Sequence, residues 1–328
     1  MEETLEQPPQ KARRISGAIT WLMRTGMWLL LGGWLLSYFG QHFYIAELLS
    51  NFRLQFLILF GVALLLTYFA RAKRLLLICL LVAFGFSAQE TLRIYLPADQ
   101  PVPGKTKVRL MSFNVWAVNW GFEEVIDEIR LHDPDVLVVL EYAGMWHEAL
   151  NALNKSYPFQ HRDPRWHGYG IAVFSKLPLE NAKSIPLTKT EIDNPAIEVS
   201  LRIDGQLLNL TAGHVMSPVS RYRLKLRNQQ FEELAESVNA KSSPKILVGD
   251  MNCTTASGYL ANLISSTQLR DSRQGFGIHT SWVKFAPLIT VPIDHVLVSE
   301  EIHIHDRFTG SSADSDHRPV IVDFSISK

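Results

Sequence analysis

Three long apolar stretches near the N-terminus constrain this chain more than any other feature of its sequence. They cover residues 25–44, 54–70 and 75–96, and the third reaches residue 96 only by including charged side chains. A helix needs about 20 apolar residues to cross a bilayer core of about 30 Å. An all-helical soluble core would need amphipathic helices nearby to cover runs that are apolar on every face. We therefore predict a transmembrane region of about three helices over residues 25–96.

The basic residues around these stretches predict an orientation. They precede the first stretch and separate the second from the third: Lys11, Arg13, Arg14, Arg24, Arg71, Lys73 and Arg74. Basic flanks stay on the cytoplasmic side of a membrane. Residues 1–24 are then a cytoplasmic tail. If the third stretch spans, the rest of the chain lies outside the cytoplasm, which we expect for a multi-pass protein of the cell (inner) membrane. If that stretch is re-entrant, the rest lies inside.

A linker separates the apolar region from the remainder. Residues 97–104 contain three prolines, which cannot continue a helix and favour an extended spacer. Residues 105–328 then form one domain, with 23 basic and 26 acidic residues and a net charge of −3. Proteins that bind nucleic acids non-specifically usually carry a basic excess. The two cysteines, Cys79 and Cys253, lie in different regions, so no disulfide framework is expected.

Polar residues stand at the ends of β-rich runs in this domain. Short β-rich runs alternate with helical patterns from residue 108 on, which indicates an α/β or α+β domain with a stacked-sheet core. The polar residues at the run ends are Asn114, Glu141, His214, Asp250, Asn252, Asp294, Asp316 and His317. A preorganised site needs such groups on a rigid apolar scaffold.

Five short motifs link these residues to a known family. They are Ser112-Phe113-Asn114-Val115, Leu140-Glu141, Gly249-Asp250-Met251-Asn252, Ile293-Asp294-His295-Val296 and Ser315-Asp316-His317-Arg318-Pro319. Together and in this order they resemble the signature motifs of the endonuclease/exonuclease/phosphatase family, here in a membrane-anchored bacterial form. The resemblance implies a four-layered α/β (α+β) sandwich, with two facing mixed β-sheets flanked by helices, after the transmembrane region. It also implies hydrolysis of a phosphoester with Mg²⁺, for which Mn²⁺ is a substitute.

The residue types suit a magnesium site. Mg²⁺ prefers carboxylate oxygens and keeps several waters, so Glu141 is the first candidate ligand and Asp316 the second. The resemblance adds Asn114, which would bind the ion or orient Glu141. An asparagine after a strand is otherwise an ordinary turn residue.

The resemblance also implies catalytic roles. Asp250 would orient or deprotonate the attacking water, and Asn252 would donate a hydrogen bond to the phosphate. The two would point to one side of an extended segment, and the alternative is an Asx turn that closes the strand. His317, held by Asp294, would contact the phosphate, and His214 is a candidate general acid beside it.

The substrate is less well defined. Val291-Pro292-Ile293-Asp294-His295 departs from the Trp-Arg-Leu-Asp-Tyr-like sequence of abasic-site endonucleases, so a repair nuclease is not expected. Five aromatic residues are candidates for a rim that holds a base or a lipid, although aromatic residues are more often core: Trp146, Trp166, Tyr169, Phe276 and Trp282.

We expect a phosphodiesterase or phosphomonoesterase anchored in a lipid bilayer, acting on a lipid head group or another extracytoplasmic phosphoester. A DNA or RNA endonuclease or exonuclease of the same family is one alternative. A catalytically silent, membrane-tethered binding module is another. The expected partners are the bilayer and a phosphoester substrate (lipid, nucleotide or nucleic acid), with no protein partner.

Overall fold

The computed structural model describes residues 10–188, 194–282 and 289–327, with backbone only for residues 10–16. The chain divides into two compact units, Met1–Leu92 and Arg93–Lys328. The first nine residues of the predicted cytoplasmic tail lie outside the described residues.

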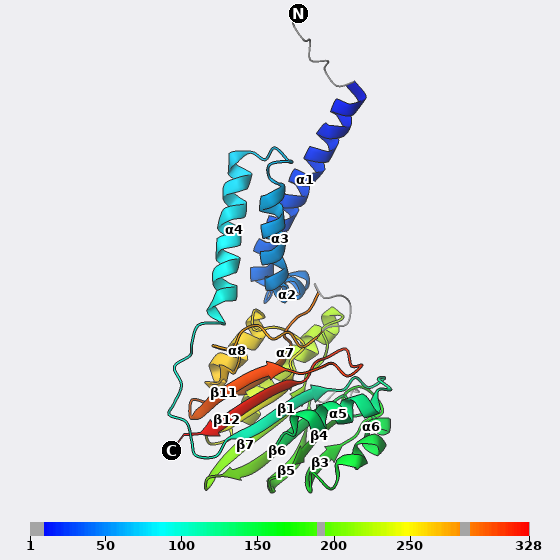
Figure 1. Cartoon of the computed structure of the whole chain (residues 1–328), viewed down its shortest axis with the longest axis vertical. Helices are drawn as coiled ribbons and strands as arrows, with labels where there is room; N and C mark the ends of the chain where they lie inside the picture. The colour runs from blue at the N-terminus through cyan, green and yellow to red at the C-terminus, as the bar shows by residue number, and fades with distance from the viewer. Residues whose placement is uncertain (1–9, 189–193, 283–288, 328) are drawn as a thin grey trace, which may run out of the picture. The chain divides into compact units, whose positions relative to one another are not determined.

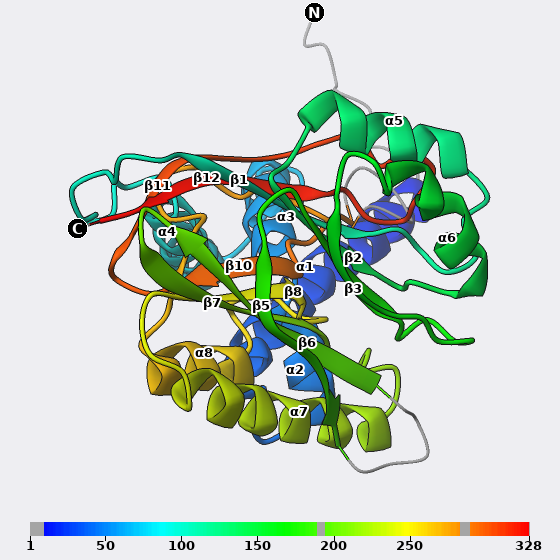
Figure 2. The ribbon, with the colours of Figure 1, turned by 90° about the horizontal axis from the view of Figure 1, so that it is seen from below.

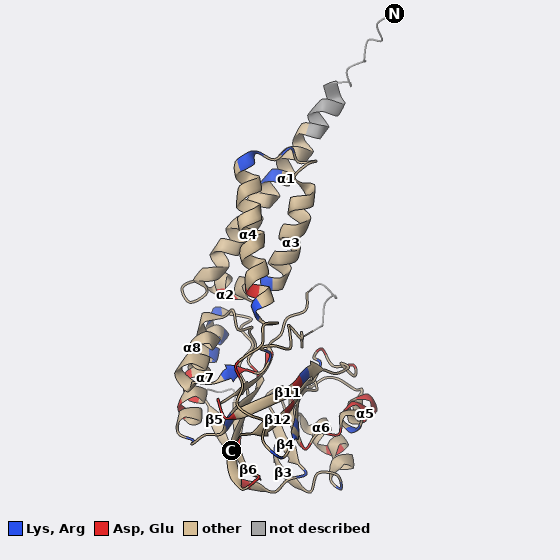
Figure 3. Cartoon of the chain, turned by 60° about the vertical axis from the view of Figure 1, so that its left-hand side comes forward, with Lys and Arg blue, Asp and Glu red and all other residues tan. Residues whose placement is uncertain are grey.

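The N-terminal unit is helical. It contains α1 (Gln10–Leu36), the 3-10 turn η1 (Ser37–Phe39), α2 (Tyr44–Ser50), α3 (Arg53–Leu66) and α4 (Arg74–Arg93) (Figure 1). The helices bury a seam that includes Leu31, Phe60 and Leu80. Their other faces expose large apolar side chains, with Leu29 at 72% and Leu65 at 77%. The middle of this unit carries no charged side chains in Figure 3, and charges gather at its ends.

The helix boundaries differ from the predicted apolar segments. Residues 25–44 are not one helix, because α1 ends at Leu36 and the chain turns through the polar residues Gln41 and His42. Among the described helices, α4 alone is long and apolar enough to cross a membrane by itself. The pair α2 and α3 meets the same criterion only as a pair, and it is bent by 77°. The third stretch, the least regular in sequence, is thus the best single candidate for a span.

The C-terminal unit contains two six-stranded mixed sheets. The first has the order β11-β12-β1-β2-β4-β3, formed by β1 (Val108–Asn114), β2 (Val136–Leu140), β3 (Phe159–Asp163), β4 (Ile171–Ser175), β11 (Ile302–Thr309) and β12 (Val320–Ile326). The second has the order β5-β6-β7-β8-β10-β9, formed by β5 (Leu179–Leu187), β6 (Asn194–Ile203), β7 (Gln206–His214), β8 (Lys245–Asp250), β9 (Arg270–Asp271) and β10 (Asp294–Val298).

Helices cover the outer face of each sheet. Those on the first sheet are α5 (Phe122–His132) and α6 (Gly144–Ala149), and those on the second are α7 (Arg221–Asn239) and α8 (Gly258–Thr267) (Figure 2). In β2, Val138 and Leu140 face the other sheet whereas Leu137 and Val139 face the helices. A strand buried on both faces is a continuous apolar run, as this one is. The predicted architecture of two mixed sheets flanked by helices is confirmed.

The proline-rich linker is extended, but it is bound to the C-terminal unit. Together with the end of α4 and the turn after it, the linker forms a strap along this unit, which covers residues 93–104. Gln274 Nε2 donates to the carbonyls of Arg93 and Leu96, each at 2.7 Å, and Gly275 N donates to Ile94 O at 2.8 Å. Further along, Gly104 N donates to Ser325 Oγ at 2.9 Å. The strap is therefore part of the domain rather than a free spacer.

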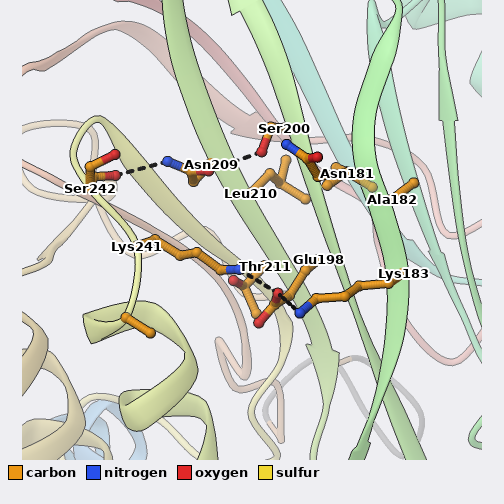
Figure 4. Close-up of a pocket in the computed structure, with 12 residues that line it drawn as sticks. Asn181, Ala182, Lys183, Glu198, Ser200, Asn209, Leu210, Thr211, Lys241 and Ser242 are labelled. Atoms are coloured by element: carbon orange, nitrogen blue, oxygen red, sulfur yellow. Dashed lines mark hydrogen bonds and ion pairs between the residues drawn. The ribbon is translucent and has the colours of Figure 1, made fainter.

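A groove of about 600 Å³ opens on the helix side of the second sheet, where α7 ends (Figure 4). Its floor is polar, because Glu198 and Ser200 of β6 and Asn209 of β7 face it. Lys183 and Lys241 reach the buried Glu198 carboxylate from two sides, at 3.1 and 2.5 Å. The single carboxylate thus already partners both ammonium groups.

Candidate active site

The predicted site residues gather at one edge of the two sheets. Asn114 ends β1 and Glu141 follows β2, and these two strands are parallel. His214 ends β7 and Asp250 ends β8, which are also parallel. Parallel neighbours finish at the same edge of a sheet. The antiparallel strand β10 begins there with Asp294 opposite Asp250.

Two of these residues have unusual backbone conformations. Glu141 has φ +57° and Asn252 has φ +48°, both in the left-handed region. A non-glycine residue in a sparsely populated conformation costs about 1–3 kcal/mol, and such residues cluster at functional sites. The conformation of Asn252 belongs to an Asx turn, in which its N–H donates to Asp250 Oδ1 at 2.8 Å. The Asx-turn alternative is therefore present, and the segment is not extended.

The Asn114 side chain joins the two carboxylates across the site. Its Nδ2 donates to Glu141 Oε1 at 3.1 Å and to Asp250 Oδ2 at 3.2 Å. Glu141 Oε2 accepts from Ala117 N at 2.8 Å. A Cβ on Gly168 would lie 3.2 Å from Glu141 Oε2, so the glycine leaves room beside this carboxylate. The carboxylate oxygens of Glu141 and the half-buried Asp316 fit a hard divalent cation. Asn114 Oδ1 accepts from Trp116 N at 3.1 Å, so the Asn114 amide orients Glu141 and does not offer an oxygen beside it.

Asp294 and His317 form a buried pair. His317 Nδ1 lies 2.8 Å from Asp294 Oδ2, and both side chains are almost wholly buried. Burial alone would lower the pKa of His317, but the charge and hydrogen bond of Asp294, with help from Asp250 and Asp316, raise this pKa to about 10. Burial alone would raise the pKa of Asp294, but His317 holds it below its usual range. The pair is therefore a carboxylate and an imidazolium at neutral pH.

Asp250 lies at the centre of this group. Its Oδ2 is 3.7 Å from His317 Nε2 and 3.6 Å from His214 Nε2. Burial and the neighbouring Asp294 carboxylate raise the pKa of Asp250. Among the described residues, Asp250, Asp294 and His317 offer ligand atoms that all lie within 4.8 Å of one another. A protonated imidazole has no lone pair for a metal, so this cluster could hold a cation only with His317 neutral.

His214 is neutral in this setting. Burial and the nearby His317 charge lower its pKa to about 4. Its Nε2 accepts from Asn252 Nδ2 at 3.3 Å, and Asn252 Nδ2 also donates to Val215 O at 2.8 Å. The His214 ring packs against Tyr169 with centroids 5.2 Å apart. Without a substrate, His214 is therefore a neutral imidazole and not the general acid that was predicted.

The candidate rim residues divide into core and surface. Trp146 and Tyr169 are buried, and Phe276 packs against the core between the sheets. Trp282 forms backbone bridges to Val291 and His317. Trp166 is 98% exposed, and its ring lies 3.9 Å from the Cβ position of Gly144, shortly after Glu141. Of the five, Trp166 is the one whose ring stands free in solvent.

Sequence reasoning missed two serines that support the site. Ser281 Oγ accepts from the backbone N–H groups of Ile293 and Asp294, at 3.1 and 3.0 Å. Ser315 Oγ donates to Asn114 O at 2.7 Å and accepts from His317 N at 3.0 Å. Ser315 is the first residue of one of the five motifs, so its role could have been predicted from the sequence. Ser281 lies in none of the motifs, and the sequence around it gives no such indication.

Comparisons with known proteins identify the family and the fold of the C-terminal unit. A sequence model described as "Endonuclease/Exonuclease/phosphatase family" matches residues 111–317. No curated protein matched the chain in sequence. An endonuclease/exonuclease/phosphatase from Beutenbergia cavernae has 18% identity and a TM-score of 0.56, covering 68% of this chain and 72% of its own.

Two further solved structures share the fold. D. rerio TDP2, complexed with single strand DNA product, has 16% identity and a TM-score of 0.59, covering 67% of this chain and 100% of its own. Sphingomyelinase C from Streptomyces griseocarneus has 17% identity and a TM-score of 0.50, covering 67% of this chain and 99% of its own.

Proposed function

Because the chain belongs to the endonuclease/exonuclease/phosphatase family, whose members hydrolyse phosphoester bonds, we propose that it is a divalent-metal-dependent phosphoesterase. The observation that carries the proposal is the buried Asp294–His317 pair beside Asp250, at the sheet edge that also holds Glu141. An ion pair of this kind is costly to bury, and perturbed groups in such clusters mark functional sites.

We assign the metal to Glu141 and Asp316, with Asn114 in its other predicted role of orienting Glu141. Carboxylate oxygens are the donors that Mg²⁺ or Mn²⁺ prefers, and the space kept by Gly168 beside Glu141 supports the assignment. A bound divalent cation would neutralise phosphate charge and stabilise the leaving oxygen. The Asn114 amide, which reaches both Glu141 and Asp250, would keep the metal site and the water-activating carboxylate in register.

The remaining groups serve the attack on phosphorus. Asp250 would orient the attacking water and take its proton, since a raised pKa brings a carboxyl group closer to the working pH of a general base. The His317 imidazolium would stabilise the negative charge that gathers on the phosphate oxygens. Asn252 and His214 would contact the same oxygens. A phosphate beside His214 would raise its pKa, so that it could act as a general acid only with substrate bound.

We propose a lipid head group as the substrate, in a protein anchored in the cell (inner) membrane through about three apolar segments, with the catalytic domain outside the cytoplasm. The exposed Trp166 beside the site and the exposed apolar faces of the N-terminal helices support a lipid. The net charge of −3 of residues 105–328 counts against non-specific binding of nucleic acid. Single-stranded nucleic acid is the second candidate, because an exposed tryptophan can also stack on bases.

Hydrolysis assays of the full chain in detergent test the proposal. The substrates are a chromogenic phosphodiester, the matching monoester, a phospholipid in vesicles and single-stranded DNA, each with Mg²⁺ or with EDTA. We expect Mg²⁺-dependent turnover that His317→Ala lowers by at least about 100-fold, because general acid–base and electrostatic groups contribute on this scale. His161→Ala, which removes a histidine on β3 that contacts Ser184, is the matched control.

The pattern of cleaved substrates tests both the lipid assignment and the enzymatic activity itself. Cleavage of DNA with no cleavage of phospholipid would replace the lipid by a nucleic acid. A folded chain that cleaves none of the four substrates would favour the silent binding module.

A further inference from the structure

Arg307 of β11 is a fully buried cation that no step of the proposed mechanism uses. Its relative exposure is 1%, and it ranks among the largest wholly buried side chains of the protein. Within the described part of the chain, its Nε and both terminal nitrogens have no hydrogen-bond partner. Leaving donors of a charged group unsatisfied inside a protein costs several kcal/mol, at about 1–3 kcal/mol for each group. A buried arginine with this cost therefore requires a compensating interaction or a function.

A β-bulge places Arg307 between the sheets. In β11, Ile302 and Ile304 face the opposite sheet, and the pairing with β12 then shifts between Ile304 and Asp306. Beyond the shift, Arg307 pairs with Val322, which also belongs to the core between the sheets. Without the extra residue, Arg307 would face the helix layer, because successive side chains alternate between the faces of a strand. Bulges that re-aim a side chain are common beside active sites.

Asp271 and Asp294 stabilise the Arg307 charge. Asp294 lies on the same face of β10 as Val296 and Val298, which belong to the core between the sheets that Arg307 also faces. Asp271 is already occupied, because Arg273 donates to its Oδ1 from the backbone and to its Oδ2 from the guanidinium. Asp294 uses Oδ2 for His317, and the Ser281 hydroxyl also stabilises the Asp294 charge. Its buried Oδ1 has no hydrogen bond of normal geometry among the described residues. The Arg307 donors and this acceptor thus carry opposite charges, and both face the interior between the sheets.

We propose that Arg307 is a positioning residue for the Asp294–His317 pair, with its guanidinium holding Asp294 Oδ1 through buried water between the sheets. The inference rests on the proposed function and adds a residue to it. Arg307 touches neither substrate nor metal. It fixes the rotation of the Asp294 carboxylate, and Asp294 in turn fixes the His317 ring that faces Asp250.

The charge of Arg307 survives its burial. Burial and the nearby Arg273 guanidinium lower the pKa of Arg307 to about 9, which still leaves it cationic at neutral pH. Removal of this cation would leave Asp294 with a buried oxygen facing an apolar interior, and the carboxylate would be free to turn. A misplacement of about 1 Å in a catalytic group costs about 100-fold in rate.

Two variants of the full chain separate positioning from mere stability. Arg307→Met keeps an apolar stem of similar length without charge or donors, and Arg307→Lys keeps the charge. For Arg307→Met we expect kcat to fall about 10-fold to 100-fold with KM within about 2-fold, because the wholly buried residue cannot touch substrate. On a logarithmic scale, the kcat of Arg307→Lys should regain at least a third of the difference between Arg307→Met and the wild type. Arg227→Met is the control, since it removes another fully buried arginine, on α7.

A second readout does not depend on turnover. The proton between His317 Nδ1 and Asp294 should give a low-field resonance in ¹H NMR of histidine-labelled protein. We expect it to shift or broaden in Arg307→Met and to persist in Arg307→Lys and Arg227→Met. If Arg307→Met does not fold, Arg307→Gln, which also lacks the charge, takes its place with the same expectations.

The outcomes distinguish this inference from the proposed function. Unchanged kcat and an unchanged resonance in a folded Arg307→Met or Arg307→Gln chain would overturn the role of Arg307, whatever the substrate. If the resonance changes in Arg307→Met while the wild-type chain shows no phosphoesterase activity, the positioning role is supported and the proposed function is rejected.

Discussion

At the scale of single residues, the space around Glu141 is as informative as its contacts. Its carboxylate is held by Asn114 and Ala117 on one side and approached by Gly168 on the other. The loop that contains Gly168 therefore limits how the proposed metal ligand can move. A methyl group in this position is the smallest change that tests the limit.

Gly168→Ala should lower kcat about 10-fold without unfolding the protein. The new Cβ would lie 3.2 Å from Glu141 Oε2 and 3.4 Å from Glu141 Cδ, so the carboxylate has to shift by a few tenths of an ångström. Small displacements of catalytic groups have large kinetic costs. Steady-state kinetics across a range of Mg²⁺ concentrations measures the effect, which should include a higher Mg²⁺ requirement.

Gly144→Ala, at the start of α6, is the matched control. Its Cβ would meet only the Trp166 ring, at 3.9 Å, which is ordinary van der Waals contact. Equal losses of activity in the two variants would show that the lost activity does not arise from the room beside Glu141.

At the scale of elements, β6 carries a buried charge that belongs to the fold rather than to the site. Glu198 accepts from Ser237 Oγ at 2.5 Å and from Lys241 Nζ at 2.5 Å, and Lys183 lies at 3.1 Å. These contacts tie β5 and the end of α7 to the helix face of β6. Burial alone would raise the pKa of Glu198, but Lys241, Ser237 and Lys183 hold it below its usual value.

Glu198→Gln should destabilise the protein at neutral pH by about 1–3 kcal/mol, the usual worth of hydrogen bonds to a charged group. The folded-state pKa lies below the ordinary value of 4.5, so the carboxylate stabilises the fold above that pH and loses this effect as the pH falls through the folded-state pKa. The difference between wild type and variant should therefore shrink below pH 4.5. Urea unfolding at neutral and acidic pH measures it.

The control for Glu198 is Glu180→Gln, on the neighbouring strand β5. Glu180 pairs with Arg202 at 3.0 Å, but both side chains are largely exposed. Exposed pairs contribute about 0–1 kcal/mol. A Glu180 variant as unstable as the Glu198 variant would contradict the distinction between buried and exposed charge.

At the scale of the whole molecule, the sequence predicted the layered domain and the edge where its polar residues meet. Strand ends are local signals, and Asn114, Glu141 and Asp250 each follow an apolar run. Ser281 and Arg307 were not predicted, because their importance arises from contacts between segments distant in the sequence. Residues 97–104 were predicted as an extended spacer, and their contacts were not predicted for the same reason, since proline content indicates extension but not what the backbone binds.

The membrane assignment remains a prediction, and α4 is where it is tested. Val82 is an exposed apolar residue near the middle of α4. Val82→Arg should lower the fraction of the chain that resists alkaline extraction from membranes, because arginine at the centre of a span costs about 2.5–3.5 kcal/mol. Val102→Arg, at an exposed position of the strap, should leave it unchanged. A span at α4 would be contradicted if Val82→Arg stayed in the membrane fraction as fully as the wild type. It would also be contradicted if the wild type itself did not associate with membranes.

The order of strands in the two sheets has a consequence for the origin of the site. Read across each sheet, neighbours pair antiparallel twice, then parallel once, then antiparallel twice. The parallel pair is β1 and β2 with α5 between them in one sheet, and β7 and β8 with α7 between them in the other. The domain thus consists of two halves with the same strand plan, one for each sheet.

The site lies where the two halves meet. Asn114 and His214 end equivalent strands, and Glu141 and Asp250 stand at the ends of the next equivalent pair. One half supplies Asn114, Glu141, Asp316 and His317, and the other supplies the water-activating carboxylate with Asn252 and Asp294. The groups that the proposed reaction needs are therefore complete only where both halves are present.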